Sequence, residues 1–339
     1  MDLKRASGGV LRSVGSRTDR SARALASHYG VQRIFTDLTA MLDDDALDIV
    51  YIATPHQLHA SDAIQCLTAG RAVLCEKPMA VSAAQTGEIV AHARERNLFC
   101  MEAMWTRFIP AVRYALQLAK GGEIGRIMSL RGDFSHPVAY HPASRFYAPE
   151  LGGGALLDRG VYLISLAQAL LGEPVRVQAS VRKAPSGVDA HSAYLLEFSN
   201  GAIGQFVSSL AVRGDNSFTV EGENGRIILQ EPFVCSHRVT VERYAPFVPR
   251  AGGAPVGGIK TGIKARLKDL GVHRKLDVLR GLKRQLSART FAFAGNGYQF
   301  ELDEAMRCLR DGKTESAAMS LDDSLAVART MDRLRANWD

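Results

Sequence analysis

The sequence predicts an α/β fold in two domains. Residues 1–107 are expected to form a doubly wound parallel sheet, and residues 108–339 an α+β domain with a large, mainly antiparallel sheet. Two observations predict this division. Before Arg107, short apolar runs alternate with amphipathic helical segments, as in β-α-β units. After it, alternating runs are joined by the hairpin signals Asn200-Gly201 and Asn224-Gly225.

The expected elements of the first domain follow from its apolar runs and helix caps. Residues 48–53 form a near-continuous apolar run of the kind buried on both faces of a sheet. Ser82 and Gln85 form a capping box that opens a helix, and Gly30 is placed as a helix stop. We therefore expect strands at residues 10–15, 34–35, 48–53, 73–75 and 98–101, and helices near residues 19–29, 38–42, 59–70 and 82–97.

The second domain is expected to contain mostly strands. The strands are predicted at residues 127–131, 175–181, 193–198, 203–212, 218–221, 227–229 and 239–241. Helices are predicted at residues 111–120, from about Gly153 onward, at 298–310 and at 320–337. The basic stretch at residues 252–287 reads better as a solvated loop and helix than as a nucleic-acid patch, because no aromatic side chains are interleaved with its basic residues.

Composition limits the class of protein. The chain has 339 residues, of which 46% are apolar and 23% charged, as expected for a soluble protein with a substantial core. No run is expected to span a bilayer, and no apolar segment follows the first residues, so we predict neither a membrane partner nor a secretory signal. Five scattered cysteines favour reduced thiols in the cytoplasm over disulfides or a metal site. The net charge of +7 could suit an anionic ligand but does not argue for nucleic acid.

The most informative stretch is Glu76-Lys77-Pro78. It follows a short apolar run, and Pro78 prevents the strand from continuing. Taken alone, Glu76 and Lys77 could be a surface ion pair. The predicted topology, however, brings the strand ends at residues 15–17, 53–55, 75–77 and 101–104 to one edge of the sheet, where ligands bind in open α/β folds. A lysine there can exchange a proton with a substrate, so the stretch is a candidate site.

These motifs together resemble the glucose–fructose oxidoreductase / inositol dehydrogenase (Gfo/Idh/MocA) family. The resemblance lies in Glu76-Lys77-Pro78, in Thr54-Pro55-His56 with His59, and in the run from Gly152 to Tyr162 that contains Asp158. Residues 101–108 and Gly295-Asn296-Gly297-Tyr298 look more narrowly like the dihydrodiol and xylose dehydrogenase branch. The resemblance implies a Rossmann-type nucleotide-binding domain, a nicotinamide cofactor, a small sugar or diol substrate, and a homodimer or higher homo-oligomer formed through an exposed sheet face.

One departure concerns the start of the family pattern. The family opens with a strand and G-x-G-x-x-G ahead of the position of Val10, and Gly8-Gly9 is not that loop. The loop normally presents backbone N–H groups to the pyrophosphate, and its strand is central in the sheet order 3-2-1-4-5-6. We therefore expect the strand at residues 10–15 to lack its partner toward the strand at residues 48–53. Either the start lies upstream, which we favour, or the product is truncated with impaired cofactor binding.

The resemblance also implies roles for individual residues. Lys77, Tyr162 and Asp158 would be catalytic: the lysine or the tyrosine takes the hydroxyl proton, the charge of Lys77 lowers the pKa of Tyr162, and Asp158 orients the pair. The choice of base between Lys77 and Tyr162 stays open. Arg145 and Tyr298 would bind substrate. The expected cofactor-binding residues are Ser16, Arg17, Thr54, Pro55, His59, Glu76, Lys77, Trp105 and Arg107.

The end of the first strand bears on the choice of nucleotide. Ser16 and Arg17 stand where an acidic residue would hold the ribose hydroxyls of NAD. A guanidinium instead suits a 2′-phosphate, so we predict NADP, with NAD as the alternative. Arg17 could also be a solvated turn residue, His59 a helix residue without a ligand, and Asp158 and Tyr162 a cap and a core side chain. Two further interpretations remain: a non-catalytic family member that acts as a sensor or partner subunit, and a basic-patch binding protein.

Overall fold

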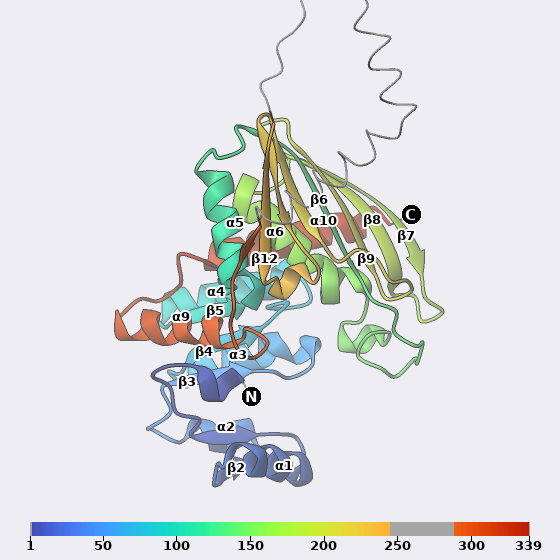
Figure 1. Ribbon diagram of the computed structural model, residues 1–339. Helices are drawn as coiled ribbons and strands as arrows, with labels where there is room; N and C mark the ends of the chain where they lie inside the picture. Colours follow the sequence, from blue (N-terminus) through green and yellow to red (C-terminus); the bar gives the residue numbers. More distant parts are fainter. Residues whose placement is uncertain (1, 245–287, 339) are drawn as a thin grey trace, which may run out of the picture.

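The computed structural model describes residues 2–244 and 288–338, and it has the predicted α/β class (Figure 1). In Figure 1 the parallel strands and their helices, in blue, lie below a large sheet in green and yellow. The basic stretch at residues 252–287 falls outside the described residues. The described residues contain two small parallel sheets and one large mixed sheet.

The first part of the chain alternates strands and helices as predicted. Its elements are η1 (Asp2–Arg5), β1 (Ser13–Gly15), α1 (Asp19–Tyr29), β2 (Arg33–Phe35), α2 (Leu38–Leu42), β3 (Ile49–Ile52), η2 (His56–Leu58), α3 (His59–Thr68), β4 (Ala72–Glu76), α4 (Ala83–Glu95), β5 (Cys100–Ala103) and η3 (Trp105–Phe108). Only one half of the predicted capping box forms: the Ser82 hydroxyl accepts from the backbone N–H of Gln85, but the Gln85 side-chain oxygen accepts no hydrogen bond from the described residues. Gly30 ends α1 as predicted, in a left-handed conformation with φ of 74°.

The parallel strands form two separate sheets. β1 pairs with β2, and β3, β4 and β5 form a separate three-stranded sheet in that order. No hydrogen-bonded strand of the described residues joins β1 to β3. The expectation that the first strand lacks its partner toward β3 is therefore confirmed, and the truncated doubly wound arrangement consists of two parallel sheets.

The three-stranded sheet has a dry core. On β4, Val73, Leu74 and Cys75 are at most 1% exposed, because both faces of the strand are packed. Val73 and Cys75 lie in one core cluster with α3 and α4, and Leu74 lies in the other cluster, with Met101 and Phe108. A fully buried side chain of this size contributes roughly 1.5–3 kcal/mol relative to an exposed one. The sheet therefore gives a rigid base to the Glu76-Lys77-Pro78 turn, whose Lys77–Pro78 peptide bond is cis.

The second part of the chain is built on an eight-stranded sheet with the order β13-β12-β11-β10-β6-β9-β8-β7. Every neighbouring pair is antiparallel except β6 with β9. Both predicted hairpins form, between β8 and β9 and between β10 and β11. The elements are α5 (Pro110–Lys120), β6 (Ile127–Ser135), η4 (Pro149–Leu151), η5 (Leu156–Gly160), α6 (Val161–Leu171), β7 (Arg176–Lys183), β8 (Asp189–Glu197), β9 (Ile203–Ser209), β10 (Phe218–Gly222), β11 (Gly225–Leu229), η6 (Phe233–Cys235), β12 (Arg238–Arg243), β13 (Arg289–Thr290), α9 (Gln299–Arg310) and α10 (Leu321–Ala336).

The helix α6 is the apolar centre of the second part. Nine of its residues, from Val161 to Ala169, are buried against the large sheet and α10. The stretch Pro149–Leu171 is long and apolar enough to cross a membrane, so the expectation that no run meets this test is wrong on length and composition. Because 89% of its most apolar window is buried inside the protein, the same residues serve here as a core helix.

The last helix of the chain fastens the two parts together. α10 packs against α4 and β5 of the first part and against α6 and β7 of the second. One anchor is the backbone N–H of Ala83, which donates to the Asp332 carboxylate at 2.8 Å. The strand ends of the small sheet therefore face the start of α6 across a fixed junction.

Candidate active site

An ion pair joins the two parts of the molecule at the end of β4. The Lys77 ammonium donates to the backbone carbonyl of Asp158 at 2.7 Å and lies 3.2 Å from its carboxylate oxygen Oδ1. Each of the two side chains is only 11% exposed. The turn after β4 and the helical segment before α6 thus meet as the sequence predicted, with a cation and an anion held in a confined space.

The glycine at residue 152 allows a close approach of the two parts. It precedes the segment η5, a π-helical turn that carries Asp158 and leads directly into α6. Gly152 has φ of +72°, and a Cβ atom there would lie 2.8 Å from Val81 and 3.0 Å from His56. Any larger residue would push the loop away from the first part of the chain. The glycine therefore sets how closely Asp158 can approach Lys77.

The charge of Asp158 is fixed by its neighbours. Burial by itself raises the pKa of this carboxyl, but the Lys77 ammonium and the Arg145 guanidinium outweigh burial and lower the pKa to about 2. Arg145 lies 3.3 Å from the same carboxylate oxygen that faces Lys77. Asp158 is therefore a carboxylate near neutral pH, and Arg145 contacts it from the exposed side.

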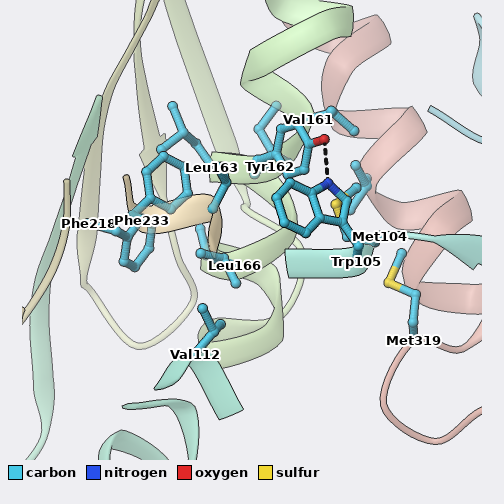
Figure 2. Close-up of a cluster of buried hydrophobic side chains, with 14 of the residues drawn as sticks. Met104, Trp105, Val112, Val161, Tyr162, Leu163, Leu166, Phe218, Phe233 and Met319 are labelled. Atoms are coloured by element: carbon cyan, nitrogen blue, oxygen red, sulfur yellow. Dashed lines mark hydrogen bonds between the residues drawn. The ribbon is translucent and has the colours of Figure 1, made fainter. Parts of the chain in front are cut away.

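Tyr162 lies against Lys77 through its ring and not through its hydroxyl. The Lys77 nitrogen is 4.8 Å from the ring centroid, while the hydroxyl oxygen accepts a hydrogen bond from the Trp105 indole at 2.8 Å (Figure 2). Burial, reinforced by the negative charge of Glu76, raises the pKa of Tyr162 well above its usual value. The expectation that Lys77 lowers the pKa of this tyrosine is therefore wrong, because desolvation of the phenolate dominates.

Aromatic side chains form the wall beside this cluster. Trp105 is 7% exposed and stacks on Tyr298, with ring centroids 4.6 Å apart and planes inclined by 19°. Glu76 closes the other side: its carboxylate accepts from the Tyr51 hydroxyl at 2.5 Å and from the backbone N–H of Lys77 at 3.1 Å. The predicted residues Lys77, Asp158, Tyr162, Trp105, Tyr298 and Glu76 are thus brought into one neighbourhood.

Two predicted cofactor-binding residues lie inside the wall instead of on its surface. His59 is 0% exposed, and its ring nitrogens face the carbonyl oxygens of Thr54 and Pro78, both at 2.8 Å. Arg107 is 6% exposed and lies against the Met319 sulfur and the Asp323 carboxylate. This placement differs from the expected direct contact with a cofactor, because the polar atoms of both side chains are already engaged with protein groups.

The remaining predicted cofactor residues follow β1 and β3. Ser16 is half-buried and Arg17 is exposed, both at the end of the separate β1–β2 sheet. Thr54 and Pro55 are half-buried after β3, and the Thr54 hydroxyl donates to Asp62 at 2.7 Å. The two groups therefore lie on different sheets, with no strand of the described residues bonded between them.

Comparisons with known proteins bear on both parts. Residues 3–104 match the profile of an oxidoreductase family with an NAD-binding Rossmann fold, and residues 112–228 match the GFO/IDH/MocA C-terminal domain. The chain belongs to the Gfo/Idh/MocA family. It is an oxidoreductase of that family, and its first part is a nucleotide-binding domain.

Relatives within the Gfo/Idh/MocA family include named enzymes. The trans-1,2-dihydrobenzene-1,2-diol dehydrogenases of Sus scrofa and Homo sapiens are each 28% identical over 325 residues, covering 95% of this chain and 87% of the relatives. Among solved structures, levoglucosan dehydrogenase with NADH and levoglucosan is 23% identical, with a TM-score of 0.76 over 97% of this chain and 88% of the other. KijD10, a 3-ketoreductase from Actinomadura kijaniata in complex with NADP and TDP-benzene, is also 23% identical, with a TM-score of 0.78 over 99% and 92%. These two structures show the same fold.

Sequence reasoning gave no role to several buried titratable groups at this site of the family fold, among them His56, Glu102 and Glu301. His56 is 8% exposed; burial and the nearby Lys77 lower its pKa to about 4, and its Nδ1 lies 3.2 Å from the Gly152 carbonyl oxygen. Glu102 is 2% exposed, and burial raises its pKa to about 7. The available signal for His56 and Glu102 was position, since the first follows a strand of the three-stranded sheet and the second lies in one.

The described residues fit the two ends of a nicotinamide dinucleotide. Lys77, Trp105 and Tyr162 offer a buried aromatic wall with polar atoms, which suits the nicotinamide ring, and Ser16 with Arg17 offers donors that suit a ribose 2′-phosphate. Between β1 and β3, where the pyrophosphate binds in such sheets, the described residues provide no glycine-rich turn that leads into a helix.

Proposed function

We propose that the protein transfers a hydride between a CH–OH carbon of a sugar, cyclic polyol or vicinal diol and NADP, with NAD as the alternative. The observation that carries this proposal is the Lys77–Asp158 pair, which sits against Tyr162 at the junction of the two parts. A small substrate entering that junction would meet a proton donor and several hydrogen-bonding groups at once. The dihydrodiol and sugar dehydrogenases among the relatives support the substrate class.

The chain's own residues would manage the substrate proton. The nicotinamide nucleotide, when bound, supplies or accepts the hydride. In carbonyl reduction, the Lys77 ammonium donates a proton to the substrate oxygen as the carbon receives a hydride, and alcohol oxidation is the reverse. Asp158 holds the ammonium in place. Burial keeps Tyr162 protonated and its ring packs against the ammonium, so Lys77 is the group that exchanges the proton.

The preference for NADP rests on Arg17. Its exposed guanidinium follows β1, next to Ser16, and can grip a phosphate with two N–H groups. No acidic residue stands at either position to receive the ribose hydroxyls of NAD.

The proposal is tested by nucleotide binding and turnover. Fluorescence titration of the full chain should show binding of NADPH more tightly than NADH. Oxidation of sugars and vicinal diols, followed at the absorbance of the reduced nucleotide, should identify at least one substrate class. Binding without turnover across such a panel would favour a non-catalytic family member, and absence of both would reject the proposal.

We also propose that the open face of the eight-stranded sheet forms a homodimer contact. The helices α5, α6 and α10 pack on one face, and the other carries a hollow of about 730 Å³ bordered by Leu195, Gln205 and Arg131. Leu195 and Ile203 are 40% and 43% exposed on this face. Light scattering should show a dimer that Leu195→Glu weakens; a monomeric parent protein would contradict the contact.

A further inference from the structure

One peptide group next to the catalytic lysine is held at both of its ends. The carbonyl oxygen of Pro78 lies 2.8 Å from Nδ1 of His59. The N–H of the same peptide group, which belongs to Met79, donates to the carboxyl oxygen Oε1 of Glu102 at 3.0 Å. His59, at the start of α3, and Glu102, in β5, therefore bind opposite ends of the peptide group that joins Pro78 to Met79, directly after Lys77.

These contacts are isolated from water. His59 is 0% exposed, Glu102 and Met79 are each 2% exposed, and Pro78 is buried. Water cannot replace a buried hydrogen-bond partner that is lost. The Pro78 carbonyl or the Met79 N–H would then have to move or remain without a hydrogen bond. The geometry is thus more costly to disturb than an equivalent contact at the surface.

The second nitrogen of His59 extends the grip to β3. It lies 2.8 Å from the carbonyl oxygen of Thr54, just beyond the end of that strand. Because carbonyl oxygens only accept, His59 donates to Pro78 in the tautomer that carries hydrogen on Nδ1. Through one peptide group, the ends of β3, β4 and β5 are tied to the turn that carries Lys77.

We propose that His59 and Glu102 are positioning residues that clamp the Pro78–Met79 peptide and thereby fix the position of Lys77 against Asp158. Neither residue reaches the substrate, since both are fully enclosed. The clamp requires an acceptor at residue 102 and a donor at residue 59, and it does not require a negative charge on Glu102. The catalytic consequence rests on the proposed function, but the position of Lys77 does not.

The test measures Lys77 directly, in the protein without substrate. The rate at which a small acetylating reagent modifies Lys77 is followed by peptide mass spectrometry and normalised to the exposed Lys183. Glu102→Leu and His59→Leu should each raise the Lys77 rate by about fivefold, because each removes one of the hydrogen bonds that hold the turn. Glu102→Gln keeps an acceptor oxygen and is the matched control, with an expected rate within about twofold of the parent protein.

The double variant separates a shared clamp from two unrelated contacts. If both side chains hold the same peptide group, the double Leu variant should modify Lys77 little faster than the faster single variant. Unchanged rates in the single variants, equal rates in the Gln and Leu variants, or effects that multiply would overturn the proposal. Where a Leu variant does not fold, amide exchange of Met79 in the parent protein decides: protection like that of β4 supports the clamp, and exchange like that of an open loop rejects it.

This design distinguishes the clamp from the proposed reaction. If Lys77 is not catalytic, its modification rate still responds to the two positions. If Lys77 is catalytic, kcat should fall in the Leu variants, and it should fall most in the variant whose Lys77 is acetylated fastest. The KM for the nucleotide should change less.

Discussion

The two parallel sheets of the nucleotide-binding domain have the same local architecture but very different support. Every residue of β5 is buried, as are the first four of β4, and the following turn is held by His59, Glu102 and Asp158. In β1 only Ser13 is buried, and β2 has no buried residue. The helices α1 and α2 pack on these two strands, and the Asp44 carboxylate receives Arg12 at 2.6 Å and Arg33 at 3.3 Å.

This contrast separates two tasks within one domain. The residues proposed to exchange the substrate proton lie where packing and buried hydrogen bonds leave a side chain few alternative conformations. The residues proposed to choose between nucleotides sit on an exposed strand end, where a substitution alters charge without disturbing a core. Changes in the three-stranded sheet should therefore affect rate and stability strongly, and changes beyond β1 should affect selectivity.

The largest effect is expected at Lys77. Lys77→Met removes the group proposed to exchange the substrate proton and should lower kcat by about 10²–10⁴-fold. The protein should remain folded by circular dichroism, because methionine can fill the same partly buried space. Lys183→Met, at an exposed position on β7, is the control and should leave kcat unchanged. Retention of most of the turnover in Lys77→Met would remove the basis of the proposed mechanism.

The second-largest effect is expected at Glu102, in how the free energy of unfolding depends on pH. Burial raises the pKa of Glu102 from 4.5 to about 7, so the folded state holds a proton that the unfolded state releases. The associated stabilisation is fully present below pH 4.5 and is lost as pH rises through 7, by ~3 kcal/mol at most.

The opposite sign is expected at Asp158. Its pKa of about 2 means that the stabilisation by Asp158 is lost only on strong acidification.

The Glu102 prediction is tested by urea titrations at pH 5 and pH 8. They should show a lower free energy of unfolding at pH 8, and Glu102→Gln should reduce this difference. An equal difference in the parent and in Glu102→Gln would show that Glu102 is not its source.

A selective effect is expected at Arg17. Arg17→Asp places a negative charge where a 2′-phosphate would bind and should raise KM for NADPH by about 10–100-fold, with a much smaller change for NADH. Arg20→Asp changes the same charge on an exposed residue of α1 and serves as the control. If Arg17→Asp changes both nucleotides equally, the assignment of NADP loses its support.

The smallest effect is expected at Asp44 and should stay within the β1–β2 sheet. Asp44→Asn weakens the contacts to Arg12 and Arg33, so amide exchange in β1 and β2 should accelerate by about fivefold or less. Exchange in β3, β4 and β5 should not change. Asp45→Asn, which alters a fully exposed neighbour paired with Arg71, is the control. Acceleration throughout both sheets would show that they unfold as one unit.

The sequence determined much of the fold because the relevant signals are local. Apolar runs located β3, β4 and β5, the Ser82 N-cap located α4, and the Asn-Gly pairs located two hairpins. The proximity of Lys77, Asp158 and Tyr162 was also predicted, since topology and family motifs place strand ends and the start of α6 together.

Contacts between distant segments determine what the side chains do at that place. Tyr162 points its hydroxyl to Trp105 and only its ring to Lys77, and this orientation depends on packing between residues 57 positions apart. His59 and Arg107 carry polar groups that a sequence reader assigns to ligands, but the fold buries both and gives their hydrogen bonds to the protein. Hydrogen-bond partners and burial are set by contacts between distant segments, so local patterns can place a side chain on an element but cannot fix the environment that controls its charge.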